Sequence, residues 1–269
     1  MISTRSKSGT TWMQMICALL VFRTPDLPAP LAEISPWVDM LAVPTDVLRA
    51  SLEAQQNRRI LKTHTPLDGL PLDPDVSYVV VARHPLDSAV SLYHQGQNID
   101  RARLRELTGA SEPDRPPAPR AALDDWLLEW VDEQVDPRQE LDSLPGVLWH
   151  LADAWARRDE ANVVLVHYDD LRTDLEGEMR HLARWLDITV PEHVWPALVS
   201  AAGFGAMRQR AVELAPDTNG VLLDPSAFFR RGSSGAGREV ITAAEYDRYL
   251  ARVARLAPSD LLVWLHRDP

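Results

Sequence analysis

Three short apolar runs, each followed by polar residues, most constrain how this chain can fold. They are "RILKTH" (Arg59–His64), "VSYVVVARHP" (Val76–Pro85) and "NVVLVHYDDL" (Asn162–Leu171). Continuous apolar runs of this length that are rich in β-branched residues are typical of parallel strands buried on both faces. We therefore predict three buried strands that carry polar residues at their carboxyl ends.

Helical patterns occupy much of the chain between these runs. In "DDWLLEWVDEQV", the residues Trp126, Leu127, Trp130 and Val131 recur at i, i+1, i+4 and i+5 and share one helix face. "VLWHLADAWARR" and "EGEMRHLARWLDI" show similar patterns. Strands that alternate with helices predict an α/β fold with a central parallel β-sheet flanked by α-helices. Ligands of such folds bind beyond the carboxyl ends of the strands, where the polar residues lie.

Length and composition favour one globular domain over residues 1–269. The net charge of −11 argues against a protein that coats nucleic acid. It still permits a small anionic ligand, because salt screens remote charges within about 10 Å. The single cysteine, Cys17, allows no internal disulfide and fits a reducing cytoplasm. The apolar run from Trp12 to Phe22 is too short to span a bilayer, so we predict a buried helix there and no membrane span.

The segment "STRSKSGTTW" (Ser3–Trp12) has the composition of an anion-binding loop. If residues 1–4 end a strand and "TTWMQMICALLV" is a helix, the intervening loop aims backbone N–H groups and a helix N-terminus at an anion. Lys7 adds a full charge, and Ser8, Thr10 and Thr11 add hydroxyl donors. The arrangement is P-loop-like, but the lysine precedes the glycine, so the Walker pattern G-x-x-x-x-G-K-S/T is absent. Taken alone, the segment is equally typical of a solvated turn that caps a helix.

Five ordered segments, within residues 1 to about 245, resemble segments of the cytosolic sulfotransferase family. "KSGTTW" resembles the 5′-phosphosulfate loop, "VARHPLDSAVSLYH" (Val81–His94) the 3′-phosphate segment, and "FFRRGSSGAG" (Phe228–Gly237) the C-terminal glycine-rich loop. "ILKTH" and "HYDDL" resemble two strand ends of the same family. The resemblance implies an enzyme that transfers a sulfuryl group from 3′-phosphoadenosine 5′-phosphosulfate (PAPS) to a hydroxyl of a small-molecule or lipid acceptor, without a metal.

The resemblance also implies roles for individual residues. Lys7 and Lys62 would stabilise charge on the leaving phosphate, and His64 would be the general base; without the family pattern, His64 is as typical of a surface or capping histidine. The donor-binding residues that the resemblance implies are Lys7, Ser8, Gly9, Thr10, Thr11, Trp12, Arg83, Ser91, Tyr168, Phe204, Arg230, Arg231 and Gly232. Within this set, Arg83 and Ser91 would hold the 3′-phosphate, because the planar guanidinium can hold two phosphate oxygens, and Arg230 and Gly232 would close over it. The aromatic residues would pack on or near the adenine, although each is also typical of a core position.

Two of the departures from the family pattern lie in the loops that carry the resemblance. Arg5 and Ser6 stand where the family usually has Tyr-Pro, which adds a cation of unassigned role beside the loop. Ala236 and Gly237 stand where the family has Asp-Trp at the end of the glycine-rich loop. A further segment, Thr108–Ala122, holds four prolines and few large apolar residues, so we predict a mobile loop that covers the acceptor pocket.

The segment "REVITAAEYD" (Arg238–Asp247) loosely resembles the family's short dimer motif and predicts a homodimer. Two other functions remain open at this stage. An ATP-dependent, kinase-like P-loop enzyme would need a lysine after the glycine and a carboxylate for Mg²⁺. A catalytically silent nucleotide-binding protein would be expected to lack Lys7, Lys62 or His64, and all three are present.

Overall fold

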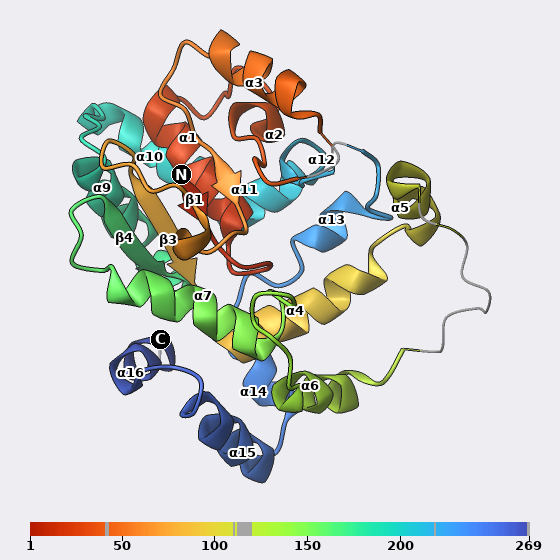
Figure 1. Cartoon of the computed structure of the whole chain (residues 1–269). Coiled ribbons are helices and arrows are strands. Elements are labelled where there is room, and N and C mark those ends of the chain that lie inside the picture. Colours follow the sequence, from red (N-terminus) through yellow and green to blue (C-terminus); the bar gives the residue numbers. More distant parts are fainter. Residues whose placement is uncertain (41–42, 110, 112–119, 218, 268–269) are drawn as a thin grey trace.

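A computed structural model describes residues 1–40, 43–109, 111, 120–217 and 219–267. Four parallel strands form one sheet in the order β2-β1-β3-β4 (Figure 1). The strands are β1 (Ile2–Ser3), β2 (Lys62–Thr63), β3 (Tyr78–Ala82) and β4 (Val163–His167). Ile2 of β1 pairs with Lys62 on one side and Val79 on the other, and Tyr78 pairs with Val163. The predicted parallel sheet of an α/β fold is confirmed.

Helices precede, join and follow these strands. Before β4, the chain forms α1 (Thr10–Phe22), α2 (Leu31–Ile34), α3 (Thr45–Ala54), α4 (Pro85–Gln97), α5 (Arg101–Thr108), α6 (Leu123–Asp132) and α7 (Leu144–Ala156). After β4, it forms α8 (Tyr168–Thr173), α9 (Leu175–Trp185), α10 (Trp195–Ala202), α11 (Phe204–Gln209), α12 (Ala211–Leu214), α13 (Pro225–Phe228), α14 (Ala236–Val240), α15 (Ala243–Val253) and α16 (Ser259–Leu265). None of the described helices is long and apolar enough to cross a bilayer.

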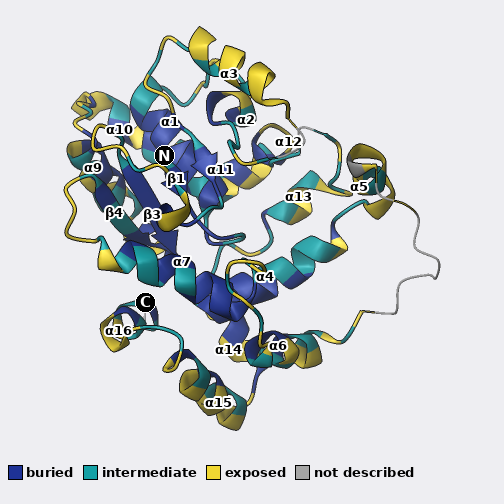
Figure 2. Ribbon diagram, in the orientation of Figure 1, coloured by how far each residue is buried: buried dark blue, intermediate teal, exposed yellow. Residues whose placement is uncertain are grey.

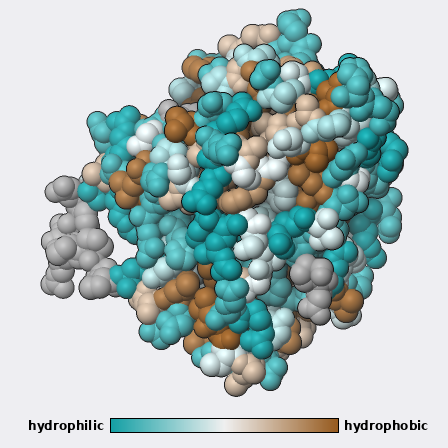
Figure 3. Space-filling view, turned by 180° about the vertical axis from the view of Figure 1, so that it is seen from behind, coloured by the Kyte–Doolittle hydropathy of each residue, from teal (hydrophilic) through white to brown (hydrophobic). Residues whose placement is uncertain are grey.

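The sheet separates two apolar clusters because successive strand side chains point to opposite faces. Val79 and Val81 of β3 pack into one cluster, with α1, α9 and α10. Tyr78, Val80 and Ala82 pack into the other, with α4, α6, α7 and the C-terminal helices. Figure 2 shows the sheet and α1 as the most buried part of the fold. On the surface seen from behind, hydrophobic side chains form small groups among hydrophilic ones (Figure 3).

The predicted elements differ from the observed ones mainly at their ends. The run Arg59–His64 forms a strand only at Lys62–Thr63, and the run Asn162–Leu171 changes from strand to helix at Tyr168. The side chain of His167 causes the second change, since its Nδ1 accepts a hydrogen bond of 3.1 Å from the backbone N–H of Asp169 and so caps α8. The predicted helix after the first strand is confirmed as α1. Most of the segment Thr108–Ala122 lies outside the described residues.

Candidate active site

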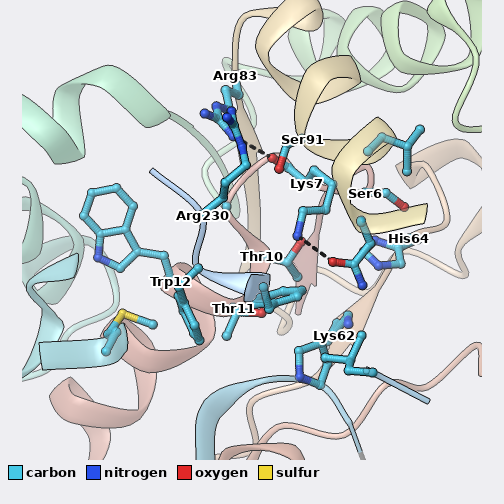
Figure 4. A pocket seen from close by; sticks show the side chains of 18 of the residues that line it. Ser6, Lys7, Thr10, Thr11, Trp12, Lys62, His64, Arg83, Ser91 and Arg230 are labelled. Atoms are coloured by element: carbon cyan, nitrogen blue, oxygen red, sulfur yellow. Dashed lines mark hydrogen bonds between the residues drawn. The ribbon is translucent and has the colours of Figure 1, made fainter. Parts of the chain in front are cut away.

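The carboxyl ends of the four strands meet at one cleft of about 440 Å³ (Figure 4). Arg83, Arg230 and Ser91 gather at one end, Lys62 and His64 lie at the other, and Lys7 lies between them. The predicted residues that line the cleft are Lys7, Gly9, Thr10, Thr11, Trp12, Lys62, His64, Arg83, Ser91, Tyr168, Phe204, Arg230, Arg231 and Gly232. Ser8 is buried behind the cleft instead, with its hydroxyl 3.4 Å from that of Ser88.

The loop between β1 and α1 is shaped to approach a ligand with its backbone. Lys7 and Gly9 have φ angles of 63° and 106°, so the chain turns sharply just before the helix. A side chain at Gly9 would place its Cβ in a tight contact of 3.1 Å with the ring of Tyr168, and the φ of 106° is strained for any residue other than glycine. None of the described side chains caps α1 with a hydrogen bond. The N–H groups of the first helical turn therefore remain available to an anion.

Lys7 lies in a strongly electropositive setting. Its amine donates a hydrogen bond of 3.2 Å to Gln95 and lies 3.7 Å from the centre of the Phe228 ring. Burial, followed by the charges of Arg83, Lys62 and Arg230, lowers the pKa of Lys7 to about 7. Within the described part of the chain, Lys7 forms no ion pair.

Arg83 and Arg230 also lack a charged partner among the described residues. Arg83 is buried, lies over the ring of Tyr168 at 4.3 Å, and donates to two backbone carbonyls, those of Lys7 and Ser233. The Nε atoms of Arg83 and Arg230 are buried without a hydrogen-bond partner in the described structure. Burying unpaired cations is costly. The cluster is therefore fitted to a ligand with several negative charges.

His64 is held with one ring nitrogen free. Its Nδ1 lies 2.5 Å from the backbone oxygen of Thr4. Because a carbonyl oxygen can only accept, Nδ1 carries the proton and Nε2 keeps its lone pair in the neutral ring. Burial, followed by the charge of Lys62, lowers the pKa of His64 to about 4. His64 is therefore neutral near pH 7 and has the protonation state that a base requires.

Lys62 lies two residues before His64, and its amine is 4.1 Å from the centre of the Trp37 ring. Burial lowers the pKa of Lys62 to about 8, and the nearby carboxylate of Asp39 opposes that shift. The ring of Trp37 also meets the imidazole of His64 edge-on, at 4.7 Å between centroids. Trp37 thus packs on both side chains and holds them at the same end of the cleft.

The structure assigns a place to Arg5, whose role the sequence left open. Its guanidinium is buried and donates to the backbone oxygen of His64 and, at 2.6 Å, to the carboxylate of Asp142. Ser6 donates to the same carboxylate at 2.8 Å. Arg5 therefore braces the strand end that carries His64, with its charge balanced by Asp142.

Asp39 is a second brace, which the sequence did not indicate. Its carboxylate accepts hydrogen bonds of 2.7 Å from the hydroxyls of Thr63 and Thr65 and of 3.1 Å from the N–H groups of His64 and Thr65. These hydrogen bonds lower the pKa of Asp39 against the opposing effect of burial. No motif marks this residue, because it belongs to an irregular segment that precedes β2 by more than 20 residues.

We expect Asp39→Asn to lower kcat about tenfold, since a weaker anchor lets the strand end that carries Lys62 and His64 shift, and small misplacements of reacting groups slow a reaction. Removing the carboxylate also removes the charge that raises the pKa of Lys62, so this pKa should fall below about 8. The alkaline limb of kcat against pH should then move to lower pH. Asp46→Asn, on the exposed surface of α3, is the matched control. An unchanged pH profile in Asp39→Asn would contradict the bracing role.

Aromatic residues form one wall of the cleft. The indole of Trp12 donates to the backbone oxygen of Ala202 at 2.8 Å and meets the ring of Tyr168 edge-on at 5.2 Å. Gly232 has a φ of 63° and packs so closely on Phe204 that an added Cβ would lie 2.4 Å from its ring. Trp12 packs against the core and also lines the cleft, and its packing on the adenine stays a prediction.

The altered end of the glycine-rich loop docks on α4. The N–H groups of Gly235 and Gly237 donate to the carboxylate of Asp87 at 2.8 and 2.7 Å. An added Cβ at Gly237 would lie 2.3 Å from the Cβ of Leu86, so this contact excludes a larger residue. Arg231, which follows Arg230, already binds both carboxylate oxygens of Glu239, at 2.7 and 3.1 Å.

The remainder of the cleft is largely apolar and was not predicted from the sequence. Its members lie on several elements and share no local pattern. They are Trp37, Met40, Leu92, Ile99, Leu104, Met207, Pro216, Val221, Leu222, Phe228 and Phe229. Within the described residues, no group of three or more His, Cys, Asp or Glu side chains could hold a metal ion.

Comparisons with known proteins agree with this geometry. Residues 1–254 match the family model for the sulfotransferase domain. A glycolipid sulfotransferase of Mycobacterium bovis (strain BCG / Pasteur 1173P2) is 42% identical over 98% of this chain and 86% of its own length. Sulfotransferase 1A1 of Rattus norvegicus is 26% identical over 95% of this chain and 83% of its own length.

Two solved structures share the fold. Mouse sulfotransferase SULT7A1, complexed with PAP, superposes with a TM-score of 0.68 at 19% identity and covers 98% of this chain and 87% of its own. Retinol dehydratase, in a complex with retinol and PAP, superposes with a TM-score of 0.70 at 21% identity and covers 100% and 82%. The fold, the family match over most of the chain and the mycobacterial relative lead to one conclusion: the chain belongs to the sulfotransferase domain family.

Proposed function

We propose that the protein transfers a sulfuryl group from PAPS to a hydroxyl of a small-molecule or lipid acceptor. The observation that carries this proposal is a neutral histidine beside a cluster of buried and half-buried cations that have no carboxylate ion-pair partner among the described residues. The neutral histidine can accept a proton as a general base. The cations can bind the phosphate groups at the 3′ and 5′ positions of PAPS. The solved relatives complexed with PAP support the choice of nucleotide.

The reaction assigns one task to each group. Nε2 of His64 takes the proton of the acceptor hydroxyl as its oxygen forms a bond to sulfur. The bond between sulfur and the 5′-phosphate oxygen breaks, and Lys7 and Lys62 meet the negative charge that grows on that oxygen. The products are a sulfate ester and adenosine 3′,5′-bisphosphate. Arg83 and Arg230 bind the 3′-phosphate throughout, and Trp12 and Phe204 flank the adenine.

An assay with radiolabelled PAPS and a panel of three acceptors, a phenol, a sterol and an alkyl glucoside, tests this function. We expect a labelled product with at least one acceptor and none when γ-labelled ATP replaces PAPS. Phosphate transfer from ATP would instead favour the kinase-like function. Tight binding of PAPS without any product, across the panel and in an extract of natural lipids, would favour a silent nucleotide-binding protein.

We expect the enzyme to prefer a donor that carries the 3′-phosphate. Adenosine 5′-phosphosulfate lacks it and should bind at least tenfold more weakly, because a charge-assisted hydrogen bond is worth roughly 1.5–3 kcal/mol. Calorimetry with the two nucleotides and no acceptor measures the difference. Arg83→Ala should reduce the preference more than Arg231→Ala, since Arg231 already pairs with Glu239. Equal affinity for both nucleotides would overturn the roles of Arg83 and Arg230.

We further propose a single domain over residues 1–269, action in the cytoplasm, and a homodimer. The only cysteine, Cys17, is buried, which suits a reducing compartment but does not require one. In the proposed dimer segment, Thr242 caps α15 through a capping box with Glu245, and Arg238 lies over the ring of Tyr246. A partner chain that binds this segment would therefore contact side chains that also make contacts within their own chain.

A further inference from the structure

A second cavity, of about 530 Å³, lies beside the cleft and shares part of its wall. Trp37, Met40, Lys62 and Pro216 line both cavities. The second cavity extends away from His64 between α1, α2, α3 and α12, and we call it the side groove. Its lining is mostly apolar and includes Phe22, Pro28, Leu31, Ile34, Val43 and Leu214.

Helix α3 forms the outer wall of the side groove. Val47, Leu48, Ser51, Ala54 and Gln55 line the groove at i, i+1, i+4, i+7 and i+8, which is one face of the helix and its C-terminal end. The charged residues of the helix point elsewhere and do not line the groove.

No residue of α3 is buried, and Val47 is 55% exposed. Figure 2 shows this helix as largely exposed at the edge of the molecule. An amphipathic helix normally buries its apolar face against the fold. The apolar face of α3 instead covers open space, which an apolar ligand would fill.

We propose that the side groove binds the alkyl chain of the acceptor, while the acceptor hydroxyl lies at His64. This inference rests on the proposed function. The shared wall at Trp37 and Met40 places the start of such a chain next to the reacting end of the cleft. An amphiphile with a hydroxyl-bearing head and a single long chain matches both cavities at once.

The polar groups of the side groove favour a chain over a peptide. The amide of Gln14 already donates to the backbone oxygen and hydroxyl of Ser35, at 2.8 and 3.1 Å. The buried atoms without a partner in the described structure include the indole N–H of Trp37 and the side-chain oxygen of Gln55. A peptide would bring many backbone groups that need hydrogen-bond partners, whereas an alkyl chain brings none. The Gln55 oxygen remains unsatisfied by an alkyl chain.

Chain length provides the test. Burying one methylene is worth a factor of about three to four in affinity. With n-hexyl, n-octyl and n-decyl β-D-glucoside as acceptors below their micelle concentrations, kcat/KM should rise about threefold per methylene, mostly through KM. Ser51→Trp, which fills the side groove, should remove this rise. Ala50→Trp is its neighbour on α3, is exposed and does not line the groove, so it should keep the rise.

A binding measurement separates this inference from the proposed function. Dansyl-undecanoate carries a chain but no hydroxyl, and its fluorescence reports binding without any donor. We expect the wild type and Ala50→Trp to bind it at least tenfold more tightly than Ser51→Trp. Binding without turnover of any glucoside would support the groove and count against sulfuryl transfer. Turnover that is independent of chain length, or equal probe binding by Ser51→Trp, would overturn the groove. Light scattering that shows a dimer for the wild type and a monomer for Ser51→Trp would also overturn the proposal, because a second copy of the chain would then occupy the side groove.

Discussion

His64→Ala is expected to lower kcat by about 10²–10⁴-fold, the usual share of a general base. The ring lies at the end of the cleft away from Arg83 and Arg230, so the affinity for adenosine 3′,5′-bisphosphate should change little. His64→Asn should be equally slow, because an amide cannot accept the proton. Single-turnover kinetics and calorimetry on each variant make the comparison, with exposed His181→Ala as the control.

The pH dependence adds a second readout for His64. Burial and Lys62 lower its pKa to about 4, so the ring is protonated only below about pH 4 and neutral above it. The rate should therefore rise with pH through about pH 4, rather than near the ordinary value of 6.5. This acid limb should vanish in His64→Ala. Wild-type kcat in His64→Ala would show that the base is another residue.

Lys7→Ala is expected to lower kcat by about 10²–10³-fold, as loss of one positioned transition-state donor does. The melting temperature of the ligand-free protein should fall little or rise. With a folded-state pKa of about 7, well below its ordinary value, Lys7 is less readily protonated in the fold than in the unfolded chain, so its charge opposes folding near neutral pH. A large drop in melting temperature would favour a structural role.

The lowered pKa of Lys7 also predicts how nucleotide binding depends on pH. A bound anion needs Lys7 protonated, so wild-type affinity for adenosine 3′,5′-bisphosphate should weaken as pH rises through about 7. Lys7→Ala should lose the part of this dependence centred near pH 7 and keep the part near pH 8 that Lys62 contributes. Calorimetry from pH 6 to 9 measures both proteins, and an identical slope in the variant would contradict the position of Lys7 beside the phosphates.

The sequence predicted those parts of the site that are encoded locally. Lys7, Lys62 and Arg83 each follow or end a strand, and a parallel sheet brings such ends to one edge. The K-x-H spacing also places Lys62 and His64 at the same strand end. The fold class brings these residues to one edge of the sheet, while their roles came from the resemblance to the sulfotransferase family.

Features that depend on contacts distant in the sequence could not be predicted in this way. Asp39 and Trp37 come from an irregular segment, and their partners on β2 become neighbours only after folding. The role of Arg5 depended on Asp142, which is distant in the chain. The pKa of His64 depended on burial, whose size no sequence motif encodes. The side groove could not be predicted because its walls come from four helices whose relative positions are set only by the fold.

The two lysines of the cleft have a practical consequence. Among 28 lysines and arginines the chain has only two lysines, Lys7 and Lys62, and both lie in the cleft. Their lowered pKa values, about 7 and about 8, leave part of each amine unprotonated and nucleophilic in mildly alkaline buffer, whereas arginine keeps its proton. Apart from the chain terminus, the only amines that an acylating or aldehyde reagent can modify are therefore those of the two lysines in this cleft. The protein thus carries a built-in attachment point for affinity labels, and nucleotide should shield it.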